Sequence, residues 1–235
     1  MDITCHRYIL ILDWRLINVK MMQAKQFFSS IADTWPFKNI LLLDMEPWVW
    51  LKRLPEVLAK FFEHCPTESR IRSRVPPNLY ICGDVFIGEN VALPPSGYIQ
   101  GPAYVGDHCT LRPSVYIREN VIVGQHCVLG NSCEFKHSIL LDHVQVPHFN
   151  YVGDSILGAY AHLGAGAILS NVRFDKSEIL IKGSNNKVYA TGLKKLGAIM
   201  GDYAEVGCNA VLQPGTCLFP HGKVYPLNSA KGIIT

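Results

Sequence analysis

The sequence contains no long apolar run, no stretch of basic residues interleaved with aromatic ones, and no cysteine pair in a CxxC spacing. Its most apolar early segment, residues 8–12, is followed at once by Asp13 and Arg15, whereas a membrane-spanning helix needs about 20 apolar residues. A formal net charge of +3 is too mild to indicate a surface that tracks a phosphate backbone. We therefore expect no membrane and no nucleic acid as partner, and a cytoplasmic protein.

Charge is also scarce, at 17% of residues against 49% hydrophobic, in a chain of 235 residues. These values suit one sizeable soluble domain with a small appendage. Three of the eight cysteines lie four residues after a large apolar residue, which predicts small buried fillers of a core rather than metal ligands or disulfides: Cys109, Cys127 and Cys133. We divide the chain into an N-terminal arm of uncertain role at 1–22, a helical region with a linker at 23–77, and the main domain at 78–235.

The main domain has a large apolar residue at every sixth position. No helix has that period, and a hexapeptide repeat is typical of a parallel β-helix in which three hexapeptides close one coil and residues eighteen apart stack. We therefore predict a mainly-β fold. The series comprises Ile81, Ile87, Leu93, Ile99, Val105, Leu111, Ile117, Val123, Leu129, Phe135 and Leu141, then Leu157, Leu163 and Leu169, then Met200, Val206, Leu212, Leu218 and Val224.

The period is interrupted between Val146 and Leu157, within the segment His148-Phe149-Asn150-Tyr151-Val152-Gly153-Asp154. Because a strict six-residue coil has no room for extra chain, we predict that this segment projects from the β-helix as a loop. In the N-terminal region, apolar spacings of three and four predict helices, and Pro55 favours the start of a new helix at Glu56–His64.

On these residues the sequence resembles the left-handed β-helix acyltransferases. It is closest to the C-terminal acetyltransferase half of the bifunctional UDP-N-acetylglucosamine pyrophosphorylases/glucosamine-1-phosphate N-acetyltransferases, over about residues 78–235. The resemblance is carried by Glu134-Phe135-Lys136, by the His148 to Asp154 segment, by Leu163-Gly164-Ala165-Gly166 with Asn171, and by Met200-Gly201-Asp202 through Gly207. It implies a left-handed parallel β-helix and no pyrophosphorylase activity, since the Gly-rich nucleotide loop of that half is missing here.

The resemblance also implies site residues. His148 matches the general base that removes a proton from the substrate amine, and an imidazole suits this task at neutral pH. Asn171 matches an asparagine that orients the amine, and Lys136 and Tyr151 match residues that bind the sugar phosphate. An arginine completes the family's phosphate clamp. Arg112 has the local Arg-Pro pattern, but we prefer Arg118 because it precedes Lys136 by eighteen positions.

Two positions depart from the family pattern. His162 stands where the family has an asparagine, and Ser177 stands where it has a lysine, although Lys176 is one position away. We include His162 and Lys176 among the candidate substrate-binding residues. These departures leave open whether the substrate is glucosamine 1-phosphate or another amino-sugar phosphate.

For the second substrate, acetyl-CoA, the resemblance implies contacts at Ala165 and Cys208 in a groove between coils of a homotrimer, with no metal required for acyl transfer. The activity expected is an acyl-CoA-dependent N-acetyltransferase in UDP-N-acetylglucosamine and cell-envelope precursor synthesis. Two alternatives remain. One is a non-catalytic trimeric scaffold or sensor. The other is a zinc-dependent hydratase of the same fold, with His108, His143 and His148 as ligands.

Overall fold

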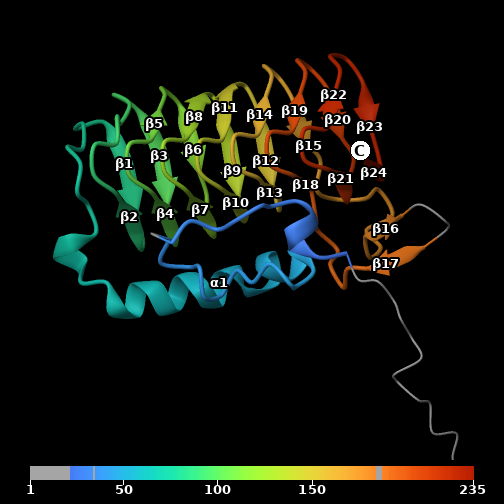
Figure 1. Cartoon of the computed structure of the whole chain (residues 1–235). Helices are drawn as coiled ribbons and strands as arrows, with labels where there is room; N and C mark the ends of the chain where they lie inside the picture. Colours follow the sequence, from blue (N-terminus) through green and yellow to red (C-terminus); the bar gives the residue numbers. More distant parts are fainter. Residues whose placement is uncertain (1–21, 34, 184–186) are drawn as a thin grey trace, which may run out of the picture.

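The computed structural model describes residues 22–33, 35–183 and 187–235. Residues 1–21 of the expected N-terminal arm lie outside the described residues. The chain forms a left-handed parallel β-helix with three flat sides, and one long helix runs along it (Figure 1). In the described part of the chain, no helix combines the length and the apolar character needed to cross a membrane.

Three parallel sheets make the sides of the β-helix. The first sheet contains β1 (Leu79–Cys82), β3 (Gly97–Gln100), β6 (Val115–Ile117), β9 (Glu134–Lys136), β12 (Tyr151–Gly153), β15 (Ile168–Leu169), β20 (Val211–Leu212) and β23 (Ser229–Ala230). The second contains β2 (Val85–Ile87), β4 (Ala103–Val105), β7 (Val121–Val123), β10 (Ser138–Leu140), β13 (Ile156–Leu157), β18 (Ala198–Met200), β21 (Thr216–Leu218) and β24 (Ile233–Ile234). The third contains β5 (Thr110–Leu111), β8 (Val128–Asn131), β11 (Gln145–His148), β14 (His162–Leu163), β19 (Glu205–Val206) and β22 (Lys223–Val224).

Inside the β-helix, a large residue and a small one alternate at each side, as the hexapeptide pattern predicts. Val105, Ile117 and Leu129 are fully buried, and so are the small residues Cys109 and Cys127. Each buried aliphatic side chain contributes roughly 1.5–3 kcal/mol. The stacked coils therefore form a rigid support on which outward side chains hold fixed positions.

The coil length, however, falls from eighteen residues to seventeen at two places. Ile117 pairs with Phe135, eighteen positions on, whereas Val121 pairs with Ser138, seventeen positions on. One residue is therefore missing at the corner occupied by His137. The same shortening recurs at the corner of Asp154, because Ile139 pairs with Ile156.

These short corners correct two expectations. The large interior residue after Phe135 is Leu140, while Leu141 belongs to the apolar layer outside the second sheet. The interval from Val146 to Leu157 does not project as a loop, because β11 and β12 occupy it and Val152 is an interior residue. The chain does leave the β-helix between Leu169 and Ala198, where the excursion contains the antiparallel strands β16 (Leu180–Lys182) and β17 (Val188–Ala190).

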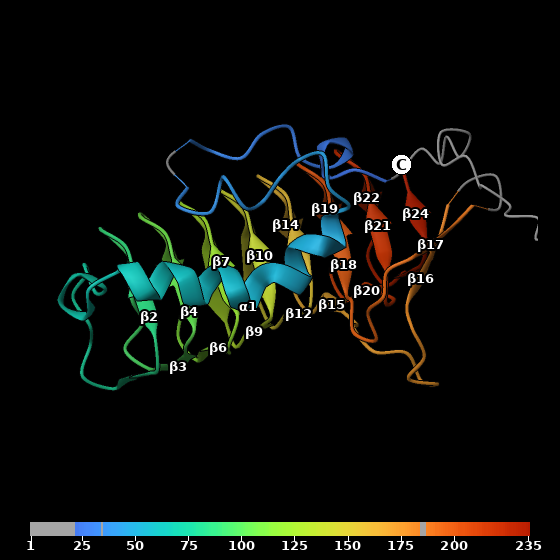
Figure 2. The ribbon, with the colours of Figure 1, turned by 90° about the horizontal axis from the view of Figure 1, so that it is seen from below.

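The N-terminal region covers the outer face of the second sheet. Helix α1 (Pro47–His64) lies across β2, β4, β7 and β10, with the chain before it following the same side (Figure 2). Short 3-10 turns occur at Ala24–Gln26 and Thr67–Ser69. Trp48, Trp50 and Leu58 are buried in an apolar layer that also contains Ile122 and Ile139. This layer gives the second sheet two apolar faces, which explains why Leu140 and Leu141 are both buried.

Pro55 does not start a new helix, since α1 is continuous from Pro47 to His64. A proline inside a helix has no N–H to donate to the carbonyl four residues earlier, which here belongs to Leu51. His137 occupies that acceptor instead, with its ring Nε2 3.0 Å from the Leu51 oxygen. Because a carbonyl oxygen only accepts, the Nε2 atom carries the proton. The first short corner is therefore bonded to the helix where Pro55 leaves an acceptor free.

Candidate active site

The candidate residues gather along two edges of the first sheet. His148 ends β11 at the edge shared with the third sheet, and Lys136 ends β9 at the edge shared with the second sheet. Between the two edges runs β12, whose three residues span about 10 Å. The side chain of Tyr151 lies on this strand. A ligand that contacts both edges must therefore lie across the outer surface of the first sheet.

Buried hydrogen bonds fix the backbone of His148. Its N–H donates to Oδ1 of Asn150 over 3.1 Å, and its carbonyl accepts from the N–H of Gly166 over 3.0 Å. Asn150 is 3% exposed, and its Nδ2 donates to the Gly164 carbonyl of the next coil over 2.8 Å. The imidazole itself is exposed. His148 is thus a solvent-accessible ring on a rigid corner.

The expected acyl-CoA positions share the column of His148. Gln145 pairs with His162, which places His148 beneath Ala165, and His162 pairs with Glu205, which places Ala165 beneath Cys208. The carbonyl of Ala165 accepts from the N–H of Asn209, but its own N–H makes no hydrogen bond within the described part of the chain. The corner therefore offers a backbone donor one coil above the candidate base. The Cys208 thiol above it is exposed.

At the opposite edge, Asp154 joins Lys136 to Asn171. One carboxylate oxygen, Oδ2, lies 3.3 Å from Lys136 Nζ and accepts a hydrogen bond from Asn171 Nδ2 over 2.5 Å. The Asp154 side chain is 8% exposed and that of Lys136 is 17% exposed. Asp154 also adopts a left-handed backbone with φ of 46°, as other corner residues of this β-helix do, among them His137 and Phe149. The buried carboxylate therefore fixes two of the expected site residues, Lys136 and Asn171.

Arg118 lies one coil below Lys136 and also has a carboxylate partner. Its Nη1 donates to Oε1 of Glu134 over 2.9 Å, while its guanidinium carbon lies 6.0 Å from the ring centroid of Tyr116. Its Nε is buried and has no hydrogen-bond partner among the described residues. Both cations of the expected phosphate clamp are therefore close together, and each is already paired with an anion.

Tyr151 completes this edge because Gly153 leaves room for its ring. A Cβ at Gly153 would lie 2.5 Å from the Tyr151 hydroxyl and 2.8 Å from Nδ2 of Asn171. Burial, followed by the charges of Asp154 and Glu134, raises the pKa of the Tyr151 phenol, and the hydrogen bond with Asn171 opposes this shift. The phenol stays neutral near pH 7 and can donate to an anion.

Three other expected residues lie elsewhere. Arg112 follows β5 on the third sheet, and its Nη1 lies 3.5 Å from the carbonyl of Pro147, next to His148. His162 is exposed on β14, on the outer face of the third sheet. Lys176 is exposed in the excursion after Asn171. The structure does not bring these three together with Lys136 and Asn171.

Glu134 and Asp154 were not among the expected site residues, although the sequence contains signals for both. Asp154 follows Lys136 by eighteen positions, the same spacing that indicated a stack for Arg118 and Lys136. Glu134 is the residue opposite Tyr116 on the neighbouring coil, beside Arg118. An acidic residue at a stacking distance from an expected phosphate-binding cation is the pattern that would have found them.

The zinc hypothesis does not fit this arrangement. His108, His126 and His143 stack along the corner between the second and third sheets, with ring centroids 4.8 and 4.9 Å apart. His148 lies at the other end of β11, on the opposite edge of the third sheet. Within the described ranges, no three potential ligands are grouped in a way that could hold a metal ion.

The sequence is similar to those of known proteins. A family model described as the GMPPB C-terminal domain matches residues 99–234. A bifunctional sugar-1-phosphate nucleotidylyltransferase/acetyltransferase of Sulfurisphaera tokodaii is 33% identical over 95 residues, which are 40% of this chain and 23% of that protein. The bifunctional protein GlmU of Methanococcus maripaludis is 39% identical over 84 residues, 36% of this chain and 20% of that protein.

A solved structure of a candidate acetyltransferase from Bacillus cereus is 20% identical, with a TM-score of 0.31, and covers 66% of this chain and 76% of that chain. This chain spans about a fifth of the length of the two curated relatives. Both are named as bifunctional proteins, and the aligned segments include only part of either protein.

Proposed function

This chain belongs to the GMPPB C-terminal domain family, and on that premise we propose that it is an acyl-CoA-dependent N-acetyltransferase that acts on an amino-sugar phosphate. Glucosamine 1-phosphate is the first acceptor to consider, and the product would enter UDP-N-acetylglucosamine and cell-envelope precursor synthesis. The name of the Sulfurisphaera relative, which includes an acetyltransferase, supports this reaction class.

One observation carries the proposal. An exposed imidazole, one coil below a backbone N–H that is unpaired among the described residues, lies at one edge of the first sheet, and two adjacent cations with a neutral tyrosine lie at the other. Acyl transfer to an amine needs a base for the amine, a donor for the developing oxyanion and a site that holds the acceptor. The two edges of the first sheet supply these groups about 10 Å apart, so the acceptor would lie between them, across the outer surface of the sheet.

In the proposed reaction, the amine nitrogen attacks the thioester carbonyl while the imidazole of His148 removes its proton. The C–S bond then breaks, CoA leaves as a thiolate, and the imidazolium returns the proton to the sulfur. The N–H of Ala165 would stabilise the oxyanion that forms between these steps. Arg118, Lys136 and Tyr151 would hold the phosphate, and Asn171, which lies at their edge of the sheet, would approach the amine from the side opposite His148.

The paired state of the cations sets a condition on this reaction. Glu134 and Asp154 neutralise Arg118 and Lys136 in the unliganded protein, so a phosphate must compete with two carboxylates for them. The Arg118 side chain is 31% exposed and can rotate toward a ligand. The Lys136 side chain is only 17% exposed and is held more firmly. We expect the arginine to exchange Glu134 for the phosphate and the lysine to keep Asp154 while contacting it.

Because Glu134 and Asp154 already neutralise both cations, the site also suits a second candidate function. This is a trimeric scaffold or sensor that does not transfer acetyl groups. To separate the two, the purified chain should be incubated with acetyl-CoA and a panel of acceptors: glucosamine 1-phosphate, galactosamine 1-phosphate and glucosamine 6-phosphate. Mass spectrometry would detect a gain of one acetyl group. An N-acetylated product supports the enzyme, and its absence with all acceptors supports the scaffold.

We further infer that the protein forms a homotrimer. Two of its flat sides, the first and third sheets, lack a covering helix in the described part of the chain, whereas α1 covers the second (Figure 2). Flat faces of this kind suit packing around a three-fold axis. Light scattering at micromolar concentration measures the mass directly, and the mass of a 26.2 kDa monomer would contradict the inference.

A further inference from the structure

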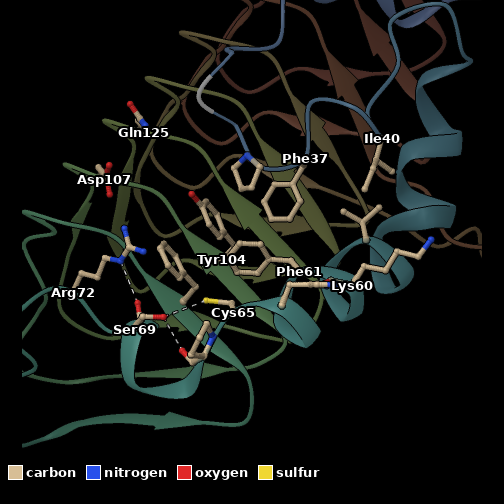
Figure 3. A pocket seen from close by; sticks show the side chains of 15 residues that line it. Phe37, Ile40, Lys60, Phe61, Cys65, Ser69, Arg72, Tyr104, Asp107 and Gln125 are labelled. Carbon is tan, nitrogen blue, oxygen red and sulfur yellow. Dashed lines mark hydrogen bonds between the residues drawn. The ribbon is translucent and has the colours of Figure 1, made fainter.

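A cavity of about 710 Å³ lies between α1, the segment before it and the first coils of the second sheet (Figure 3). Its size falls within the range of about 300–1,000 Å³ that small-molecule sites occupy. None of the residues proposed for acetyl transfer lines it, and it opens on the outer side of the second sheet, while Lys136 and His148 border the first. The cavity therefore requires an explanation of its own.

Four aromatic rings form the floor of this cavity. Phe86 and Tyr104 are parallel, with centroids 4.7 Å apart, and Phe61 meets Tyr104 edge to face at 5.3 Å. Phe37 also meets Tyr104 edge to face, at 5.0 Å. Phe37 and Phe86 are buried, whereas Phe61 and Tyr104 are half-buried, so these two present ring surface to the cavity. The exposed parts of these two rings offer aromatic surface to a flat ring.

A polar wall borders the rings on one side, formed by Arg72, Asp107 and Gln125 (Figure 3). Arg72 Nε donates to the Ser69 carbonyl over 3.1 Å, and its guanidinium carbon lies 5.0 Å above the ring centroid of Phe86. Neither terminal nitrogen of Arg72 has a partner in the described part of the chain. Asp107 uses one oxygen, Oδ1, to accept the N–H of Glu89 over 2.8 Å, and its other oxygen has no partner among the described residues.

Two further groups on this wall are unpaired among the described residues: the side-chain amide of Gln125 and the hydroxyl of Tyr104. Burial, with the charge of Asp107 as the next cause, raises the pKa of Tyr104 to about 12, so the hydroxyl stays protonated. No ion pair joins Arg72 to Asp107 within the described ranges, although both border the same space. The wall therefore offers charged and neutral donors beside acceptors, directly next to aromatic ring surface.

We propose that this cavity is a binding site for a nucleoside, recognised through its base. A nucleobase is a flat ring whose edge carries donors and acceptors together, and this combination matches ring surface bordered by Arg72, Asp107 and Gln125. The base packs on Phe61 and Tyr104, and its edge lies between the guanidinium and the carboxylate. Lys60 stands on the far side of the rings (Figure 3), where a phosphate on the ribose would reach it after separating it from Glu56.

The proposal is independent of acetyl transfer, and binding alone tests it. Adenosine, guanosine, cytidine and uridine, each also as the 5′-monophosphate, would be titrated into the full chain by calorimetry, with inorganic phosphate as a separate arm. We expect at least one nucleoside to bind with a millimolar or lower Kd and its monophosphate to bind at least as well. Binding of phosphate alone, or of no nucleoside at millimolar concentration, would overturn the proposal.

Variants locate the site. Arg72→Gln should weaken binding about tenfold, since it removes charge-assisted hydrogen bonds to the base. Arg74→Gln is the matched control, because Arg74 is an exposed arginine two positions on that does not line the cavity. Tyr104→Phe keeps the ring and removes the hydroxyl, so it should weaken binding less than Arg72→Gln. Thermal unfolding of each variant verifies that the fold is intact.

Acetyl-CoA contains a nucleotide of its own, so the two sites must be distinguished. Saturating acetyl-CoA should leave the nucleoside affinity unchanged, and His148→Ala should bind the nucleoside as the native chain does. If Arg72→Gln and Arg74→Gln bind the nucleoside equally well, or if His148→Ala no longer binds it, the nucleoside is not in this cavity.

Discussion

Replacing His137 with Ala tests how the helical region is joined to the β-helix. In the native chain the His137 ring donates to the Leu51 carbonyl over 3.0 Å, because Pro55 cannot. The variant leaves that carbonyl without a partner, which costs about 1–3 kcal/mol. For a chain of this size each kcal/mol lowers Tm by about 2–4 °C. Calorimetric or fluorescence-monitored unfolding measures the shift.

A second substitution isolates the hydrogen bond from lost packing. Pro55→Ala restores a backbone N–H four residues after Leu51, in the position where a regular helix would donate to it. In a double-mutant cycle, His137→Ala should therefore cost less in the Pro55→Ala background than in the native one, with a coupling of about 1 kcal/mol. Equal costs in both backgrounds would refute the claim that His137 substitutes for the missing N–H.

Three further predictions concern the site and its surroundings. Lys136→Met should raise KM for the sugar phosphate about tenfold or more with a smaller change in kcat, as steady-state kinetics would measure; an unchanged KM would remove Lys136 from the clamp. Alkylation of the exposed Cys208 should slow when CoA is present, as mass spectrometry of the labelled peptide would show; an unchanged rate would contradict its place in the CoA groove. Burial lowers the pKa of His137 below 6.5, so the folded chain binds this proton less readily than the unfolded chain. The folded chain therefore has its full stability above about pH 6.5 and loses part of it as the pH falls below this value and His137 is protonated. A Tm–pH profile of His137→Ala should lack this loss of Tm at low pH.

The sequence pattern predicted the β-helix because its physical cause is local. One large and one small buried residue recur at fixed spacing, and this spacing requires three sides per coil whatever lies outside. The two short corners were not visible in the same pattern. Ile139, Leu140 and Leu141 are all apolar, because α1 covers the outer face of the second sheet, so no alternation marks which leucine faces inward.

The positions of the main candidate site residues could also be predicted from the repeat, but their hydrogen-bond partners could not. The register brings Arg118 beside Lys136 and aligns His148 with Ala165 and Cys208, residues that the family resemblance indicated. Their carboxylate partners, Glu134 and Asp154, lie sixteen and eighteen positions after Arg118 and Lys136, which is a sequence signal, but spacing alone does not show that the side chains reach each other. The role of Pro55 was equally hidden, since the group that replaces its N–H comes from His137, far along the chain.

The central claim is that His148 is the base of an acetyl transfer, and kinetics of thiol release from acetyl-CoA test it most directly. With an amino-sugar phosphate as acceptor, the native chain should release one thiol for each N-acetylated product. His148→Ala should lower kcat by about 10²–10⁴ with a much smaller effect on KM. Full activity in His148→Ala would contradict the assignment of the base, and a native chain that releases no thiol with any such acceptor would contradict the reaction itself.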